Sequence, residues 1–93
     1  MQGYQFYEEF RDESLEVSAE SVIAVTQQSE PVVREGAVVC NAFRTMKSPE
    51  TGTDMIAGVL LAAEYLGTHC KEVSEERARE IQPQLFEYLD RLA

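Results

Sequence analysis

The sequence is poor in the residues that build several common kinds of site. Only two of its 93 residues are cysteine, too few for a disulfide framework, and none is tryptophan. The five glycines are dispersed, so no glycine-rich phosphate-binding loop is present. The longest apolar run, Met55–Ala63, has nine residues, whereas a transmembrane helix needs about 20. No charged segment followed by an apolar stretch opens the chain, so we expect a cytoplasmic protein with free thiols and no signal peptide.

Basic residues are scarce as well. Seventeen acidic residues face eight lysines and arginines, which gives a formal net charge of −9. The acidic excess is greatest in residues 8–30, where seven acids accompany one base. Such a surface repels nucleic-acid phosphates and favours a partner with a basic surface, although negative charge also keeps a small protein soluble.

Length and composition indicate one folded domain over residues 1–93. Apolar residues make up 44% of the chain and charged residues 27%, which is ordinary for a globular protein. A chain of this length buries enough surface for one hydrophobic core.

The first half of the chain favours β-structure. Aromatic side chains alternate over residues 4–10, which predicts an edge strand, although Phe6 and Phe10 also align at helical spacing. The β-branched run at residues 22–26 predicts a second strand, and residues 37–43 are its expected antiparallel partner.

Two helical regions are expected in the second half. Residues 54–66 are apolar almost all round, which is typical of a buried helix. Ser74 has the character of an N-cap, and Pro83 interrupts the following apolar spacing, so we expect a break at Gln82 and a final helix that begins at Pro83. The expected fold is α+β, with a small antiparallel sheet of two or three strands followed by two C-terminal helices packed on one face.

Soft metal ligands are few. Cys40, His69 and Cys70 could begin a zinc site or form a cysteine–histidine nucleophile pair, but no metal-binding spacing is present. We therefore expect no metal and no cofactor, and a small metal- or thiol-dependent enzyme is the last of three hypotheses.

Residues 54–82 offer a second hypothesis, a helix-turn-helix DNA-binding regulator. Ala63, Gly67 and Val73 fall near the small, glycine and apolar positions of such a motif. The second helix would carry three glutamates against two arginines, an unsuitable charge for contacts with phosphates.

The first hypothesis is a small, acidic, non-catalytic module that binds another protein, with nucleic acid and membrane not expected as partners. Aromatic residues are favoured at interface centres, and carboxylates could mimic the phosphates of nucleic acid, as in an inhibitor. A homo-oligomer is compatible with this hypothesis. The expected partner-binding residues are Tyr4, Phe6, Tyr7, Glu8, Glu9, Phe10, Asp12 and Glu13.

Overall fold

A computed structural model describes residues 3–10, 19–27 and 32–92 of the chain. These residues form six strands and three helices. The strands are β1 (Tyr4–Phe10), β2 (Ala19–Thr26), β3 (Val32–Arg34), β4 (Ala37–Lys47), β5 (Asp54–Ala62) and β6 (Cys70–Val73). The helices are α1 (Ala63–His69), α2 (Glu75–Ile81) and α3 (Pro83–Leu92).

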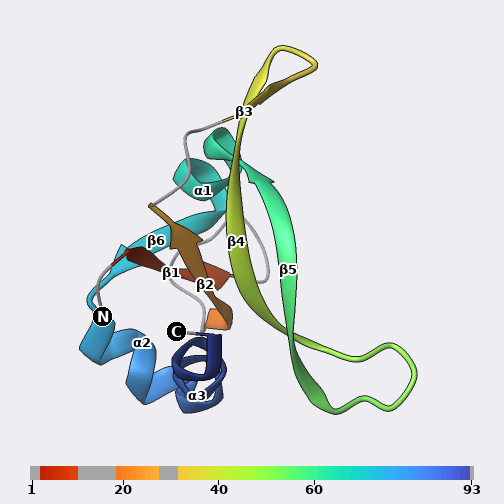
Figure 1. Cartoon of the computed structure of the whole chain (residues 1–93), viewed down its shortest axis with the longest axis vertical. Coiled ribbons are helices and arrows are strands. Elements are labelled where there is room, and N and C mark those ends of the chain that lie inside the picture. Colours follow the sequence, from red (N-terminus) through yellow and green to blue (C-terminus); the bar gives the residue numbers. More distant parts are fainter. Residues whose placement is uncertain (1–2, 11–18, 28–31, 93) are drawn as a thin grey trace.

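The strands form one antiparallel sheet in which β4 is the longest member (Figure 1). Along one edge, β4 pairs with β5 in a continuous register from Val39↔Ala62 to Lys47↔Asp54. Along its other edge, β4 pairs first with β3 and then with β2. From β2 the sheet continues through β1 to β6. The first strand of the chain therefore lies inside the sheet.

Helices cover parts of both faces of the sheet. The α2–α3 face carries the cluster of Phe6, Val22, Ala24, Ala78, Leu85, Phe86 and Leu89. The opposite face, which we call the α1 face, carries Ile23, Val25, Ala42, Leu66 and Cys70. Strand residues alternate between the two clusters because successive side chains of a strand point to opposite faces.

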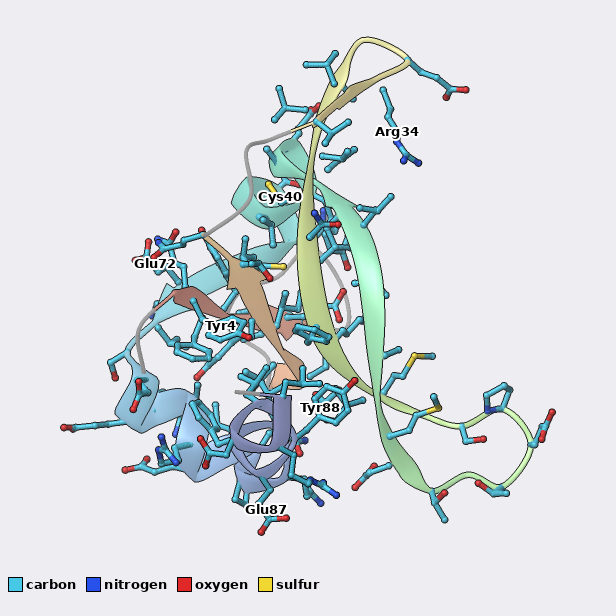
Figure 2. The ribbon with its side chains drawn as sticks, viewed as in Figure 1. Tyr4, Arg34, Cys40, Glu72, Glu87 and Tyr88 are labelled. Atoms are coloured by element: carbon cyan, nitrogen blue, oxygen red, sulfur yellow. The ribbon has the colours of Figure 1, made fainter. Side chains whose placement is uncertain are left out.

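Aromatic rings extend the core of the α2–α3 face toward β4. The ring of Phe43 lies 6.5 Å from that of Tyr4 and 5.5 Å from that of Tyr88 on α3. Tyr4 and Tyr88 are labelled in Figure 2. On the helix side, Phe6 and Phe86 lie 5.0 Å apart between ring centres. These contacts anchor α3 over one end of the sheet.

The expected fold was wrong in the size of the sheet and in the placing of the helices. The sheet has six strands, not two or three, and three helices lie on its two faces. The main error was residues 54–66, where a strand of nine residues precedes the short helix α1. An all-round apolar run suits a buried helix or a strand covered on both faces. Here the continuous pairing with β4 decides the outcome, since β4 pairs with one edge of β5 along its whole length.

Several local predictions are confirmed. Residues 22–26 and 37–43 lie in β2 and β4, which pair antiparallel. The hydroxyl of Ser74 accepts a hydrogen bond from the backbone N–H of Arg77 at the start of α2, and α3 begins at Pro83. Residues 4–10 are a strand, but β1 pairs on both sides and is not at the edge. None of the helices within the described ranges is long and apolar enough to cross a membrane.

Candidate functional site

The structure buries four of the eight predicted partner-binding residues. Tyr4 and Tyr7 are half-buried, whereas Phe6, Glu8, Glu9 and Phe10 are buried. This follows from the position of β1 inside the sheet, where helices cover both faces. Asp12 and Glu13 lie outside the described residues.

Glu8 and Glu9 are used in internal ion pairs, one on each face of the sheet. Glu8 points to the α2–α3 face, where its carboxylate accepts a hydrogen bond of 2.7 Å from Nε of Arg77 on α2. Glu9 points to the α1 face and is only 1% exposed. Its Oε1 lies 2.5 Å from Nη2 of Arg44 on β4. The Glu9 ion pair therefore joins β1 to β4, and the Glu8 ion pair joins β1 to α2.

Two hydroxyl groups complete the surroundings of the Glu9 carboxylate. Ser21 on β2 donates to Oε1 at 2.5 Å, and the phenol of Tyr65 on α1 donates to Oε2. A buried carboxylate is costly unless it is paired and hydrogen-bonded, and here both oxygens have donors. The Glu9 cluster, which consists of Glu9, Ser21, Arg44 and Tyr65, therefore joins β1, β2, β4 and α1.

Three side chains on the α1 face, those of Tyr65, Cys70 and Tyr7, are harder to ionise than usual. Burial, the hydrogen bond to Glu9 and the negative charge of Glu9 together raise the pKa of Tyr65 to about 12. Burial and the charge of Glu9 likewise raise the pKa of Cys70 to about 11. The pKa of Tyr7 is also raised, mainly by burial and then by Glu72. At neutral pH the Cys70 thiol is therefore protonated, which disfavours it as a nucleophile.

The residues of the metal or thiol hypothesis do not form a recognisable centre. Cys40 is half-buried on β4 (Figure 2), and Cys70 is buried on β6. The ring of His69 stacks on Tyr65 at 4.6 Å, and its Nδ1 lies 2.7 Å from the hydroxyl of Thr68. Within the described ranges, no group of three histidine, cysteine or acidic residues is arranged to hold a metal ion.

Residues 54–62 are not helical, so the first helix of the helix-turn-helix hypothesis is missing there. Residues 54–62, expected to begin that motif, are strand β5, and β6 separates α1 from α2. The described residues of 54–82 therefore do not form two successive helices joined by a tight turn, which the motif requires.

Most of the exposed large apolar side chains lie on β3, β4 and β5, and they are divided between the two faces of the sheet. Val32 and Leu60 lie on the α2–α3 face, and the α1 face carries Val33, Val38, Met46 and Met55. Strand register puts Val39, Ala62 and Val32 in one row on the α2–α3 face. The next row holds Asn41 and Leu60, and the row after it holds Phe43 and Gly58. Leu60 is 46% exposed and Val32 is 44% exposed. We call these two residues, together with the half-buried Val39 and Ala62, the open patch.

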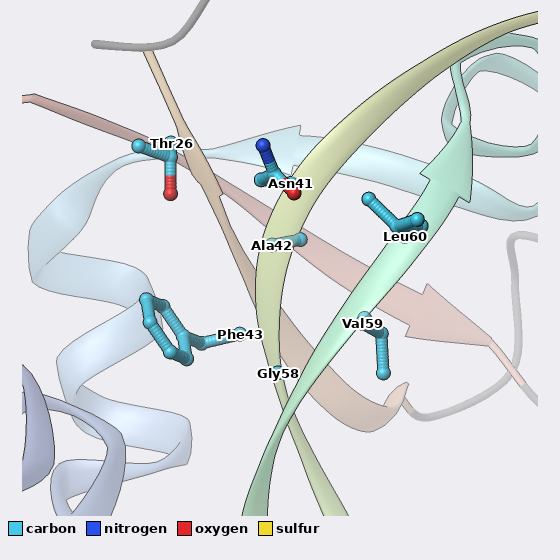
Figure 3. Close-up of a pocket in the computed structure, with 7 residues that line it drawn as sticks. All are labelled: Thr26, Asn41, Ala42, Phe43, Gly58, Val59 and Leu60. Carbon is cyan, nitrogen blue, oxygen red and sulfur yellow. The ribbon is translucent and has the colours of Figure 1, made fainter. Parts of the chain in front are cut away.

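A hollow of about 410 Å³ adjoins the open patch (Figure 3). Its walls include the side chains of Thr26, Phe43 and Leu60, and Gly58 lies between the latter two. A Cβ atom at Gly58 would lie 3.9 Å from the Phe43 ring, in ordinary contact, so the absent side chain leaves the space open. The hollow can receive an apolar side chain, with the polar groups of Thr26 and Asn41 at its wall.

Sequence reasoning missed this surface because it assigned residues 54–66 to a helix. The run itself carried a usable signal, since Gly58 weakens a helix and residues 55–63 contain no charged side chain. Read as a strand, that run is a candidate partner of residues 37–47, and the register that places Leu60 opposite Asn41 comes from the structure.

Comparisons of the chain with protein-family models, with curated proteins and with solved structures found no match.

Proposed function

We propose that this chain is a non-catalytic interaction module that binds another protein through the open patch and the adjoining hollow. The observation that carries the proposal is the exposure of Leu60 beside the hollow, on a face whose other half is covered by α2 and α3. Exposed contiguous apolar surface on a small protein is typical of interaction sites. The hollow offers a pocket for an anchoring side chain, which is how interface hot spots bind.

The net charge supports a partner of a particular kind. At −9 the chain favours approach by a basic surface, whereas the open patch itself is uncharged. The expected partner segment therefore presents an apolar side chain to the hollow and basic residues around it. In such an arrangement the opposite charges raise the rate of association, and the burial of apolar surface supplies the binding free energy.

The interface that we propose differs from a phosphate-mimicking surface at residues 8–13. Glu8 and Glu9 are buried and paired with Arg77 and Arg44, so their charges are already engaged within the chain. The support for a protein partner comes instead from the open patch and the adjoining hollow on β3, β4 and β5.

Three variants test the proposal, and two of them introduce a charge on opposite faces of the β4–β5 pair. Leu60→Asp places a charge in the open patch, and Met46→Asp places one on the α1 face, where Met46 is 39% exposed. Gly58→Val fills the hollow without changing charge, and β-branched side chains suit a strand. Each protein is immobilised, exposed to nuclease-treated lysate of the source cells, and its bound proteins are quantified by mass spectrometry.

The proposal expects a basic protein that binds the unmodified chain and Met46→Asp equally. The same protein should be reduced at least about tenfold with Leu60→Asp and with Gly58→Val, corresponding to about 1.4 kcal/mol. A set of bound proteins that is the same for all four chains would refute it. Circular dichroism of each variant checks that the fold is retained.

A further inference from the structure

The sheet has three free edges of very different character. Of the strands that the structure describes, β6 pairs only with β1, β3 only with β4, and β5 only with β4. The β6 edge is four residues long and carries Lys71 and Glu72, and β3 has three residues and ends at Arg34 (Figure 2). Short length and charge are the usual protections against unwanted strand pairing.

The β5 edge lacks those protections. It is nine residues long, contains no proline, and pairs with β4 without a bulge. Its single charged residue is Asp54 at one end, and residues 55–62 are uncharged. Among the described residues, no strand pairs with its outer side (Figure 1). Unpaired N–H and C=O groups on such an edge form a template for a further strand.

We propose that two copies of this chain pair antiparallel through their β5 edges about a two-fold axis at Gly58. This goes beyond the proposed function and does not depend on it. In this register Gly58 faces Gly58 of the second copy. Each remaining residue of β5 faces the residue of the second copy that lies equally far from Gly58 in the opposite direction, so the two residue numbers of every pair add up to 116.

Self-pairing suits the side chains of this edge. Leu60, which is exposed, would face Ile56 of the second copy on the α2–α3 face. Met55, also exposed, would face Leu61 of the second copy on the α1 face. Both exposed apolar side chains of β5 thereby gain an apolar neighbour, and cross-strand pairs of this kind stabilise sheets.

Charge also favours this arrangement in spite of the net charge of −9. Each Asp54 would face Ala62 of the second copy, so no like charges are opposed. The two Asp54 residues would be eight strand positions apart, roughly 27 Å at about 3.4 Å per residue. Their repulsion is then weak, because the screening length at physiological salt is about 8 Å. A parallel arrangement in register would instead bring them together.

The consequence is one continuous sheet with two open patches on the same face. A two-fold axis perpendicular to the sheet keeps the α2–α3 faces of both copies on one side. The two hollows would then lie on either side of the axis, each next to Leu60 of its own copy. Such a dimer would offer two equivalent docking sites to a partner.

Site-directed crosslinking tests both the dimer and its register. In a Cys40→Ser background, Gly58→Cys would bring two thiols face to face, with Cα atoms about 4.5–5.5 Å apart, within the range of a disulfide. Met55→Cys is the matched control on the same strand, since two such residues would be roughly 20 Å apart. Cys70 remains in place because it is buried.

The expected result is a species of about 21 kDa, twice the chain mass of 10.5 kDa, in analytical ultracentrifugation of the unmodified protein. Oxidation should convert most of Gly58→Cys to a covalent dimer and leave Met55→Cys at least about tenfold less crosslinked. A monomer at all concentrations up to 100 µM would overturn the inference, and so would a dimer that crosslinks equally at both positions or at neither. A monomer whose partner still depends on Leu60 would overturn this inference and leave the proposed function intact.

Discussion

Replacing Arg44 by methionine should reveal how strongly the buried Glu9 cluster supports the fold. The substitution keeps much of the apolar stem of the side chain and removes the positive charge 2.5 Å from Oε1 of Glu9. Glu9 would keep its hydroxyl donors, Ser21 and Tyr65, but would have lost the charge partner that the structure shows. A carboxylate that is 1% exposed then remains buried with an uncompensated charge.

The magnitude follows from that burial. Removing one partner of a buried ion pair costs about 3–5 kcal/mol. The Arg44 side chain is 33% exposed, so water screens part of the pair and the lower value, about 3 kcal/mol, is expected. At about 0.05–0.15 kcal/mol per residue, a chain of this length has roughly 5–14 kcal/mol of unfolding free energy in all. The change should therefore lower Tm by at least about 12 °C.

Urea denaturation followed by circular dichroism measures this loss directly. Arg91→Met is the matched control, because Arg91 is exposed on α3 and the change there should stay within about 0.5 kcal/mol. Glu9→Gln should lower the unfolding free energy less in the Arg44→Met background than in the unmodified chain. The difference should be about 1 kcal/mol or more, because the two side chains interact. If Arg44→Met lowers the unfolding free energy no more than Arg91→Met does, then hydroxyl donors alone satisfy Glu9 and the reasoning fails.

Three further predictions concern other parts of the fold. Since the pKa values of Cys70 and Tyr65 rise from 9.0 to about 11 and from 10.0 to about 12 on folding, the native state holds their protons more tightly. Their stabilisation is complete below pH 9 and is lost as pH rises from about 9 to 12, so the urea midpoint should fall across the accessible part of that range, and Cys70→Ala should flatten the first part of the fall. Ser74→Ala removes the N-cap of α2 and should cost about 1 kcal/mol in the same assay, whereas no loss would mean that water replaces the hydroxyl. Gly58→Ala should raise the unfolding free energy by about 0.4–1 kcal/mol, because the new Cβ meets only the Phe43 ring at 3.9 Å; a decrease would show that the strand needs glycine there.

The features that the sequence predicted correctly are those determined by local chemistry. The β-branched run at residues 22–26, the cap at Ser74 and the break before Pro83 each depend on a few neighbouring residues. The errors arose where distant partners decide. Residues 54–62 are strand because β4 lies beside them, and β1 is internal because β6, more than 60 residues later, closes its second edge.

The candidate site was harder to predict than the fold for the same reason. Glu9 stands among acidic and aromatic neighbours in the sequence, and nothing local indicates that Arg44 and Tyr65 will enclose it. Conversely, Leu60 lies in the most apolar part of the chain, yet it is exposed because α2 and α3 cover the other half of its face. Burial of an individual side chain depends on the packing of layers, which residue type alone does not fix.

The position of β1 has a consequence for the order in which the protein can fold. β1 lies at the start of the chain, but its second neighbour β6 and the Arg77 partner of Glu8 lie near the other end, and the members of that ion pair are 69 positions apart. Contacts between such distant segments require closure of a long loop, and they slow folding. During synthesis the second edge of β1 therefore cannot pair until β6, which ends at Val73, has been made. A β1–β2 pair that forms before then has an open edge that the finished protein keeps inside the sheet.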